Sequence, residues 1–205
     1  MFLIREPSEA RISRAFDAQR DASFSYAEVG ASREAPGEIP GYTVDHNRVK
    51  LGEGAEAFGR AVDALGGWRM FEVGWAGLLP PGAPVEVGTT VAVFARHYGF
   101  RSLNFSRVVY GISEDDGGVR KRGFAYGTLP EHGESGEERF TVEWHRDGPV
   151  FYDLYAFSRP NHPLARLGHP FARGLQRRFA RDSLRAMVRA AGEEPAPGRH
   201  APRRR

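Results

Sequence analysis

The sequence predicts an α+β protein in which one curved antiparallel β-sheet wraps around a long C-terminal helix. Residues 68–158 alternate between apolar and polar side chains with the period of two that is typical of strands. The breaks between these runs are too short for the crossovers that parallel strands require, so antiparallel hairpins are expected. Residues 170–191 then carry the period of an amphipathic helix. A lone sheet must bury one face, and this helix can cover it.

The first predicted element is a short helix over residues 8–20. Ser8 is a suitable N-cap, and Ile12 and Phe16 form a small apolar face. Residues 21–47 are rich in Gly, Pro, Ser and charged side chains and show no sustained period. We therefore expect this stretch to be an ordered but irregular arm.

One strand is expected near residues 42–50, and a second helix over residues 54–65. The helix is predicted by apolar side chains that recur at helical spacing: Phe58, Ala61, Val62 and Leu65. Gly66 and Gly67 are expected to end it, because glycine is favoured just beyond the last turn of a helix.

Six runs in the alternating region are predicted strands: residues 68–75, 85–96, 102–113, 122–129, 138–145 and 150–158. The C-terminal helix is expected to face the sheet with an apolar stripe: Phe171, Leu175, Phe179, Ala186, Met187 and Ala190. Arginines spaced by four form a ladder on another face of this helix: Arg177, Arg181, Arg185 and Arg189. We interpret the ladder as a solvated face, with a membrane or nucleic-acid patch as the alternative.

This order of elements is that of the helix-grip fold, which START-like and Bet v 1-like proteins share. We therefore divide the chain into an N-terminal helical extension (1–22), a single helix-grip-like domain (23–191) and a disordered basic tail (192–205). Such a fold can enclose a cavity between sheet and helix where small side chains replace large ones. Fold alone does not assign a function.

The composition excludes several classes of protein. The 205 residues are 40% hydrophobic and 12% aromatic, which is enough for a buried core. The absence of cysteine rules out disulfides, thiolate metal sites and cysteine nucleophiles. No uncharged run approaches the length of a membrane span, and charge follows the N-terminus too closely for a signal peptide, so a cytoplasmic location is expected. No cofactor is indicated, because the P-loop and dinucleotide motifs are missing. Serine hydrolysis has no support, because the nucleophile-elbow motif is also missing.

The net charge of +3 is unevenly distributed. Residues 170–205 contain ten arginines against three acidic residues, whereas the rest of the chain is mildly acidic. A basic segment confined to one end argues against a specific nucleic-acid-binding face.

Three segments carry a resemblance to a known family. They are residues 24–30 with 51–54 and 68–70, residues 122–132 leading into 135–140, and residues 156–160 with Gln176. Together they closely resemble the domain of unknown function 1990 family, also called uncharacterised protein family 0548. The resemblance covers residues 23–190 and implies the helix-grip fold. The family name assigns no activity, so function must be argued from the residues.

Segment 124–129 supplies the main candidates for ligand contact. Phe124, Tyr126 and Thr128 share one face of the predicted strand, so we expect Tyr126 and Thr128 to offer hydroxyl groups to a ligand in the cavity. Gly127 allows another group to approach the backbone closely. The alternative is ordinary sheet packing, with Tyr126 donating to a backbone carbonyl.

Trp68 and either Arg96 or Arg107 are expected near the wall of this cavity. An arginine inside a cavity is costly unless it is paired. An anionic group of the ligand is one possible partner, and Glu137 or Glu138 is the other.

Four candidates for chemistry lie within seven residues: His132, Glu134, Glu137 and Glu138. A histidine beside carboxylates suits acid–base catalysis or a hard metal, but no second histidine stands at helical spacing, so no metal site is predicted. The alternative is a solvated acidic hairpin loop. Asp153 would be a general-acid candidate if it pointed inward, and we expect it to be exposed at the sheet surface.

The sequence favours a protein that binds a hydrophobic or amphipathic small molecule in a cavity beneath the C-terminal helix. A second hypothesis is a cyclase- or hydratase-type enzyme on the same scaffold, with Tyr126, His132 and Glu137 or Glu138 as acid–base groups. A third is a regulatory protein–protein interaction module with a filled core. The sequence does not specify the ligand, the reaction or the oligomeric state.

Overall fold

The computed structural model of the protein describes residues 2–3, 6–34, 37–97, 99–146, 148–161 and 169–192. The strands are β1 (Phe2–Leu3), β2 (Thr43–Glu53), β3 (Ala76–Leu79), β4 (Thr90–His97), β5 (Phe100–Asp116), β6 (Val119–Thr128), β7 (Glu134–His145) and β8 (Pro149–Pro160). The helices are α1 (Glu9–Gln19), α2 (Gly54–Gly66) and α4 (His169–Gly192), with short 3-10 helices η1 (Ala31–Arg33) and η2 (Arg69–Phe71).

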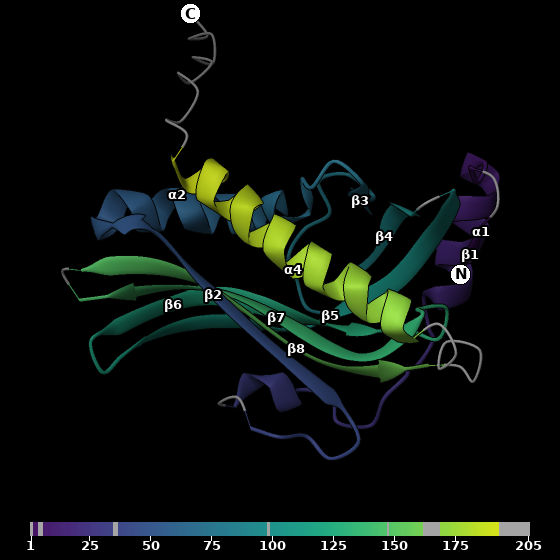
Figure 1. Ribbon diagram of the computed structural model, residues 1–205, viewed down its shortest axis with the longest axis horizontal. Helices are drawn as coiled ribbons and strands as arrows, with labels where there is room; N and C mark the ends of the chain where they lie inside the picture. Colours follow the sequence, from purple (N-terminus) through teal and green to yellow (C-terminus); the bar gives the residue numbers. More distant parts are fainter. Residues whose placement is uncertain are drawn as a thin grey trace, which may run out of the picture.

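All strands join one antiparallel sheet in the order β2-β8-β7-β6-β5-β4-β3, and β1 pairs with β5 beside this path. The first long strand, β2, therefore lies beside the last strand, β8. The sheet curls, and α4 crosses over its inner side (Figure 1). The predicted helix-grip fold is confirmed by this arrangement of a curved antiparallel sheet and a long C-terminal helix.

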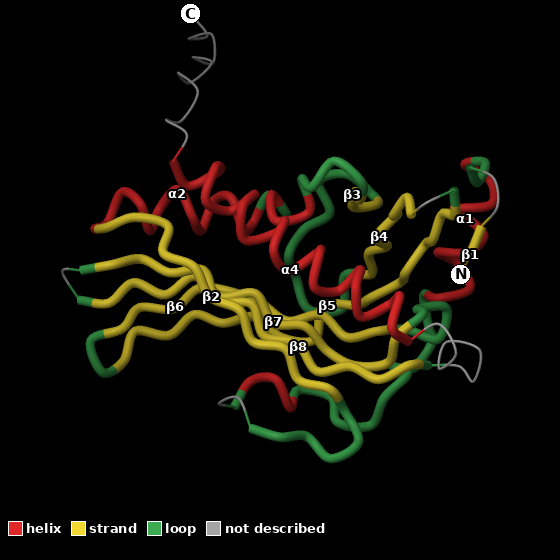
Figure 2. The backbone as a smooth tube through the Cα atoms, viewed as in Figure 1, coloured by secondary structure: helices red, strands yellow, loops and turns green. Residues whose placement is uncertain are grey.

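The sheet has two covered faces, because successive side chains on a strand point to opposite sides. We call the side toward α2 and α4 the concave face and the other side the convex face (Figure 2). The concave face carries the main apolar core, which includes Phe124, Phe140, Tyr152 and Met187. The convex face is covered by α1 and by residues 21–34 and 37–42, which we call the arm.

The convex side is held by two aromatic clusters. Phe16 of α1 packs edge-on against Phe105 of β5, with ring centroids 5.1 Å apart. Tyr26 of the arm packs on Phe157 of β8 at 5.7 Å. The irregular arm that the sequence predicts is thus an ordered cover for the sheet, because its aromatic side chain replaces water on an apolar surface.

The prediction of a strand over residues 68–75 is wrong. Trp68 has a left-handed backbone (φ 56°), and η2 follows it. Trp68, Met70 and Phe71 are all buried, so these apolar residues reach the core from a turn and not from alternate positions of a strand. Pairing with β4 begins only at Ala76.

Two further boundaries differ from the prediction by more than three residues. β4 begins at Thr90 and not at residue 85, because a turn precedes it in which the Thr89 N–H donates to the Glu86 carbonyl at 3.0 Å. β7 begins at Glu134 and not at residue 138. The acidic side chains from Glu134 to Glu138 therefore sit on a strand, which assigns each of them to one face.

β5 contains one extra residue relative to its partner β6. Val108 pairs with Tyr126 and Tyr110 pairs with Ala125, so Val109 forms a β-bulge. Val108 consequently faces the concave core, whereas Tyr110 lies in a cluster on the convex face. A regular strand would have placed both on the same side.

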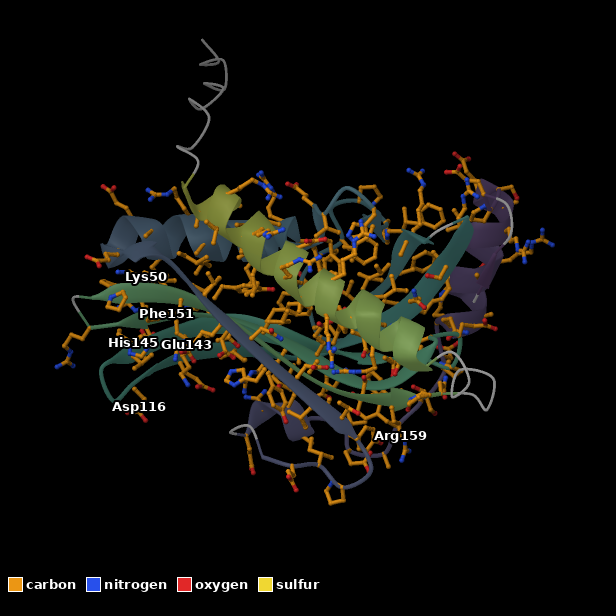
Figure 3. The ribbon with its side chains drawn as sticks, viewed as in Figure 1. Lys50, Asp116, Glu143, His145, Phe151 and Arg159 are labelled. Atoms are coloured by element: carbon orange, nitrogen blue, oxygen red, sulfur yellow. The ribbon has the colours of Figure 1, made fainter. Side chains whose placement is uncertain are left out.

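The sheet has two ends that differ in surroundings. The hairpin end carries the β5–β6 and β7–β8 turns, and the open end lies where β8 finishes at Pro160. Figure 3 shows Asp116, Glu143, His145 and Phe151 at the hairpin end and Arg159 at the open end. At the hairpin end Glu143 pairs with Arg48 at 2.6 Å.

On α4, the predicted division between an inner stripe and an outer arginine ladder is seen for the described side chains. Ala186, Met187 and Ala190 are buried, and Phe179 packs on Phe71 at 5.2 Å. The ladder residues are exposed: Arg177, Arg181, Arg185 and Arg189. The Phe171 side chain and residues 193–205 lie outside the described residues. Among the described helices, none has an apolar stretch long enough to cross a membrane.

Candidate functional site

Tyr126 lies at the centre of the concave face. Its ring is stacked on Trp68 with centroids 6.5 Å apart and meets Phe140 edge-on at 5.2 Å. Its hydroxyl donates a hydrogen bond to Glu138 Oε2 at 2.6 Å. The sequence thus placed Tyr126 and Trp68 together in the interior, but the acceptor of the Tyr126 hydroxyl is a carboxylate and not a backbone carbonyl.

Glu138 is brought to Tyr126 by the sheet register. The two residues are direct cross-strand partners on β7 and β6, so their side chains share one face. Burial raises the pKa of Glu138 to about 7, which the hydrogen bond from Tyr126 opposes and the nearby charge of Asp45 reinforces. A carboxyl with this pKa is available at neutral pH both as a proton donor and as a proton acceptor.

A second carboxyl, Glu134, lies four residues before Glu138 on β7, toward the open end. Burial raises its pKa, while the Arg173 charge and hydrogen bonds from Ser158 and Gln176 lower it. Gln176 Nε2 also donates to Ser158 Oγ at 3.0 Å, which links α4 to β8. These groups form a polar lining where the first half of α4 faces the sheet.

The cation of this region is already paired. Arg173 of α4 donates to both carboxylate oxygens of Asp45 on β2, at 2.5 and 2.7 Å. A bidentate pair of this kind fixes the geometry of both side chains. Arg173 also donates to Gln176 Oε1 at 2.6 Å, so the helix, β2 and β8 are joined by one network.

The concave face remains partly accessible in this region. Glu138, Ala156 and Ser158 are each half-buried. Burial is nevertheless the main cause of the raised pKa of Glu138. In contrast, Ser135 and Glu137, which point to the other side of β7, are buried. The concave face therefore keeps some accessible surface at these three side chains.

Ser106 adds an unused hydrogen-bonding group to this face. Its side chain is fully buried at 0% exposure, and its hydroxyl has no hydrogen-bond partner. Ser106 lies two residues before Val108, which pairs with Tyr126, so it shares the concave face with Tyr126. Buried polar groups without a partner are rare. The cross-strand partner of Ser106 is Thr128, two positions along the strands from the Val108–Tyr126 pair.

His132 stands apart from the carboxylates of β7, in the loop that follows β6. Its Nδ1 accepts a hydrogen bond from the Glu134 N–H at 3.0 Å. Burial lowers the pKa of His132 to about 4, so the imidazole is neutral at physiological pH. In this setting its ring orders the start of β7 and cannot supply a proton at neutral pH.

Glu137 is not part of the concave site, which corrects its place among the acid–base candidates. It is 2% exposed and points to the convex face. There it accepts hydrogen bonds from the Tyr26 hydroxyl at 2.6 Å and from the N–H groups of Gly30 and Ser32 at 2.8 and 3.0 Å. The Ser32 hydroxyl also donates to it. Glu137 thus anchors the arm.

Gly127 does permit a close approach, but the approaching group belongs to the chain itself. A Cβ atom at this position would lie 2.1 Å from Tyr26 Oη and 2.8 Å from two ring carbons of the same side chain. The Tyr26 ring therefore rests directly on the backbone of β6. This contact explains why a glycine stands between two large side chains of the strand.

Arg96 and Arg107 do not line the concave face, so the structure places them away from the cavity wall where they were expected. Arg107 donates to the carbonyls of Gln19, Arg20 and Ala22 at 2.6, 2.7 and 2.9 Å. The Gln19 carbonyl belongs to the last residue of α1, and the other two carbonyls lie just beyond the end of the helix. Arg96 is exposed and pairs with a carboxylate before α1, that of Glu6, at 3.2 Å.

Thr128 and Asp153 also differ from expectation. The Thr128 hydroxyl lies 2.6 Å from Ser25 Oγ and accepts from the Gly136 N–H at 2.9 Å, so it joins the arm to β7 and is not free for a ligand. Asp153 is 4% exposed and not at the surface. It lies on the convex face between His46 at 2.6 Å and Arg139 at 3.1 Å.

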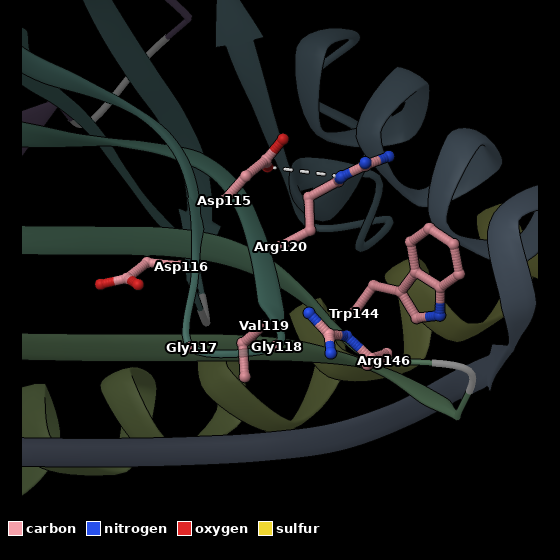
Figure 4. A pocket seen from close by; sticks show the side chains of 8 residues that line it. All are labelled: Asp115, Asp116, Gly117, Gly118, Val119, Arg120, Trp144 and Arg146. Carbon is pink, nitrogen blue, oxygen red and sulfur yellow. Dashed lines mark ion pairs between the residues drawn. The ribbon is translucent and has the colours of Figure 1, made fainter.

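Two surface hollows lie elsewhere. One, of about 260 Å³, is at the hairpin end and contains the Arg120–Asp115 ion pair at 3.3 Å (Figure 4). The other, of about 290 Å³, lies between α4 and β2 and is lined by Val49, Leu184, Arg185, Val188 and Arg189. Neither borders Tyr126 or Glu138. Within the described ranges, no three His, Asp or Glu side chains gather in a way that could hold a metal ion.

The sequence analysis did not identify four polar residues that lie with Tyr126 and Glu138 on the concave side: Asp45, Ser106, Ser158 and Arg173. Parity along β8 could have placed Ser158 on the face of Tyr152 and Leu154. The Asp45–Arg173 pair joins β2 to α4 across 128 residues of chain, so no local signal indicates it.

Solved structures with a similar backbone arrangement include a hypothetical protein of Helicobacter pylori, with a TM-score of 0.49 and 12% identity over 75% of this chain and 91% of that one. The Zhui aromatase/cyclase of Streptomyces sp. R1128 gives a TM-score of 0.49 and 13% identity over 74% and 94%. A norcoclaurine synthase of Thalictrum flavum, solved with dopamine and hydroxybenzaldehyde, gives 0.43 and 11% over 76% and 90%.

Sequence comparison identifies relatives over nearly the full chain. A UPF0548 protein of Deinococcus radiodurans is 39% identical over 94% of this chain and 100% of the relative. A UPF0548 protein of Dictyostelium discoideum is 34% identical over 94% and 96%. The model of a family described as a domain of unknown function (DUF1990) matches residues 25–186. The chain therefore belongs to the DUF1990 family, also named UPF0548, as its motifs predicted.

Proposed function

We propose that this protein binds a small amphipathic molecule between the concave face and the first half of α4, with Tyr126 and Glu138 as the polar groups that orient it. The observation that carries the proposal is the Tyr126–Glu138 hydrogen bond at 2.6 Å, which lies beside accessible surface in the interior. An interior carboxyl that is not part of an ion pair and still has accessible surface has room for a further partner.

The surroundings of this pair fit a ligand that is mostly apolar. Leu78 of β3, Val93 of β4 and Phe179 of α4 are packed against the concave core but only partly buried. Small-molecule sites commonly combine such apolar walls with a few fixed polar groups. Deeper under α2, aromatic rings of Trp68, Phe71 and Phe140 fill the core, so the proposed ligand lies toward the open end.

The experiment is native mass spectrometry of protein purified from its own host, as wild type and as Tyr126→Phe. We expect a bound mass in the wild type and a reduced occupancy in the variant, because the variant loses one hydroxyl of the site. Tyr110→Phe is the matched control, since the Tyr110 hydroxyl pairs with Ser32 on the convex face. A wild type without bound mass, or equal losses in both variants, would refute the proposal.

A second candidate function, acid–base catalysis on the bound molecule, is favoured by the pKa of Glu138. A carboxyl whose pKa is about 7 can exchange a proton with a substrate at neutral pH. In this case Glu138 is the proton-transfer group and Tyr126 positions it. Incubation of the released native ligand with wild type and with Glu138→Gln distinguishes the two functions, because only an enzyme changes the ligand and only the wild type retains that activity.

A further inference from the structure

We propose that the ligand presents a cationic group, such as a protonated amine, to Glu134 and Glu138. This inference rests on the proposed function and adds the chemical class of the ligand to it. The charged groups that face the site from the described elements around it support this class of ligand.

The carboxylates outnumber the cations. β7 contributes Glu134 and Glu138, β2 contributes Asp45, and α4 contributes Arg173. Arg173 is the cation that faces these groups among the described residues, and both of its terminal nitrogens are committed to Asp45. Neither glutamate has an ion-pair partner in that part of the chain. His132 is neutral at physiological pH, since its pKa is about 4.

Interior carboxylates without a partner are costly, so they either hold a proton or meet a cation. Burial raises the pKa of both Glu134 and Glu138, which shifts each carboxyl toward its protonated form. A ligand with a positive charge offers the second state. An ammonium group also has three N–H donors and no acceptor, which suits a site whose free groups accept.

Ser106 provides an independent observation that points to a ligand. Its buried hydroxyl has no partner and shares the concave face with Tyr126. A hydroxyl oxygen can accept from the same ammonium group or from another donor of the ligand. An anionic ligand would instead have to displace Asp45 from its bidentate contact with Arg173, and it would face two carboxylates.

Binding of a cation should be linked to proton release. An ammonium beside Glu138 favours the ionised carboxylate, so the bound state holds fewer protons than the free state below about pH 7. Affinity for a cation must therefore rise with pH through this range. Affinity for a carboxylate ligand would fall, since ionisation of Glu138 repels it.

The experiment compares three probes with one apolar chain and different head groups: octylamine, octanol and octanoate. Binding is measured by isothermal titration calorimetry at about pH 5.5 and about pH 8, where Glu138 changes from mostly neutral to mostly ionised. We expect octylamine to bind most tightly and to gain at least about tenfold in affinity at the higher pH.

Three variants locate the effect. Glu138→Gln should weaken octylamine binding by about tenfold at the higher pH and flatten its pH dependence, because the neutral amide cannot ionise. Glu134→Gln should weaken it in the same direction and guards against a folding defect in the first variant. Glu114→Gln, a change at an exposed carboxyl of β5, should leave binding unchanged.

The outcomes separate this inference from the proposed function. If octanol or octanoate binds at least as tightly as octylamine, and Tyr126→Phe weakens that binding, the site is amphipathic but the cationic class is wrong. The class is also wrong if octylamine binding is indifferent to both glutamate variants. If no probe binds and no native ligand is retained, the proposed function itself fails.

Discussion

Glu137 and Glu138 are neighbours on β7, yet their carboxylates lie on opposite faces of the sheet and have opposite surroundings. Glu137 accepts hydrogen bonds from the arm through Tyr26, Gly30 and Ser32. Glu138 accepts one, from Tyr126. Because successive side chains of a strand point to opposite faces, Glu137 anchors the arm and Glu138 lies in the candidate site.

The first prediction concerns the anchor of the arm. Glu137→Ala should destabilise the protein by about 3 kcal/mol or more, because it leaves buried donors of Tyr26, Gly30 and Ser32 without an acceptor. Tyr26→Phe removes one of these donors and should cost about 1 kcal/mol. Urea denaturation measures both. Equal and small effects would contradict the anchoring role.

The second prediction concerns the pH dependence of stability at Glu138. Its pKa is about 7 in the folded protein against 4.5 for the free side chain, so the folded state binds more protons between these values. The free energy of unfolding should therefore fall as pH rises through this window, by at most about 3 kcal/mol. Glu138→Gln should remove this fall, because the amide does not titrate.

The measurement is urea denaturation of wild type and variant at several pH values across the window. The stability difference between Glu138→Gln and wild type should grow in favour of the variant as pH rises. Glu114→Gln, at an exposed position on β5, is the control and should give a constant difference. A difference for Glu138→Gln that does not change with pH would mean that the carboxyl is solvated.

The third prediction has the opposite sign and concerns His132. Its pKa is about 4 in the folded protein against 6.5 for the free side chain, so the unfolded state binds more protons between these values. Stability should fall as pH decreases through this window, by at most about 3 kcal/mol. His132→Gln should lessen this loss. NMR titration of the imidazole gives the folded-state pKa directly, and a value near 6.5 would show that the ring is hydrated.

The fourth prediction tests the close contact of Gly127 with Tyr26. Gly127→Ala should destabilise the protein by about 2–4 kcal/mol, because the new methyl group would overlap the Tyr26 ring and force the arm away. In a Tyr26→Ala background the same substitution should cost much less, since the ring is gone. A double-mutant cycle measures this coupling, and additive effects would show that the arm does not rest on Gly127.

Where the sequence pattern was sufficient, the reason was strand parity. The alternation from Phe124 to Thr128 placed Tyr126 in the interior because period two is a property of the local backbone. The same rule separates Glu137 from Glu138 once β7 begins at Glu134, whereas the sequence pattern predicts that this strand begins at residue 138. The paired strand β8 begins and ends as predicted to within two residues.

Where the sequence pattern failed, the missing information was tertiary. Arg107 is a charged side chain on an apolar strand, which the sequence analysis interpreted as a place in the cavity wall. It donates instead to carbonyls at the end of α1 and just beyond it, more than 80 residues away in the chain. Asp153 is buried because His46 and Arg139 come to it from other strands. Trp68 and Met70 flank the polar Arg69, so this buried turn has the apolar–polar alternation of a strand.

β5 accommodates the extra residue Val109 in its bulge. Val108 is held in the core by its pairing with Tyr126, and Tyr110 is held on the other face by its hydroxyl contact with Ser32 at 2.6 Å. Deletion of Val109 would remove the bulge and make Val108 and Tyr110 consecutive residues, which a regular strand also points to opposite faces. The pairing of β5 with β6 would then be kept on both sides of the deleted residue. A one-residue deletion elsewhere in the paired part of β5 would instead turn the side chains beyond it to the other face, so Val109 is the position of this strand where a deletion should be tolerated best.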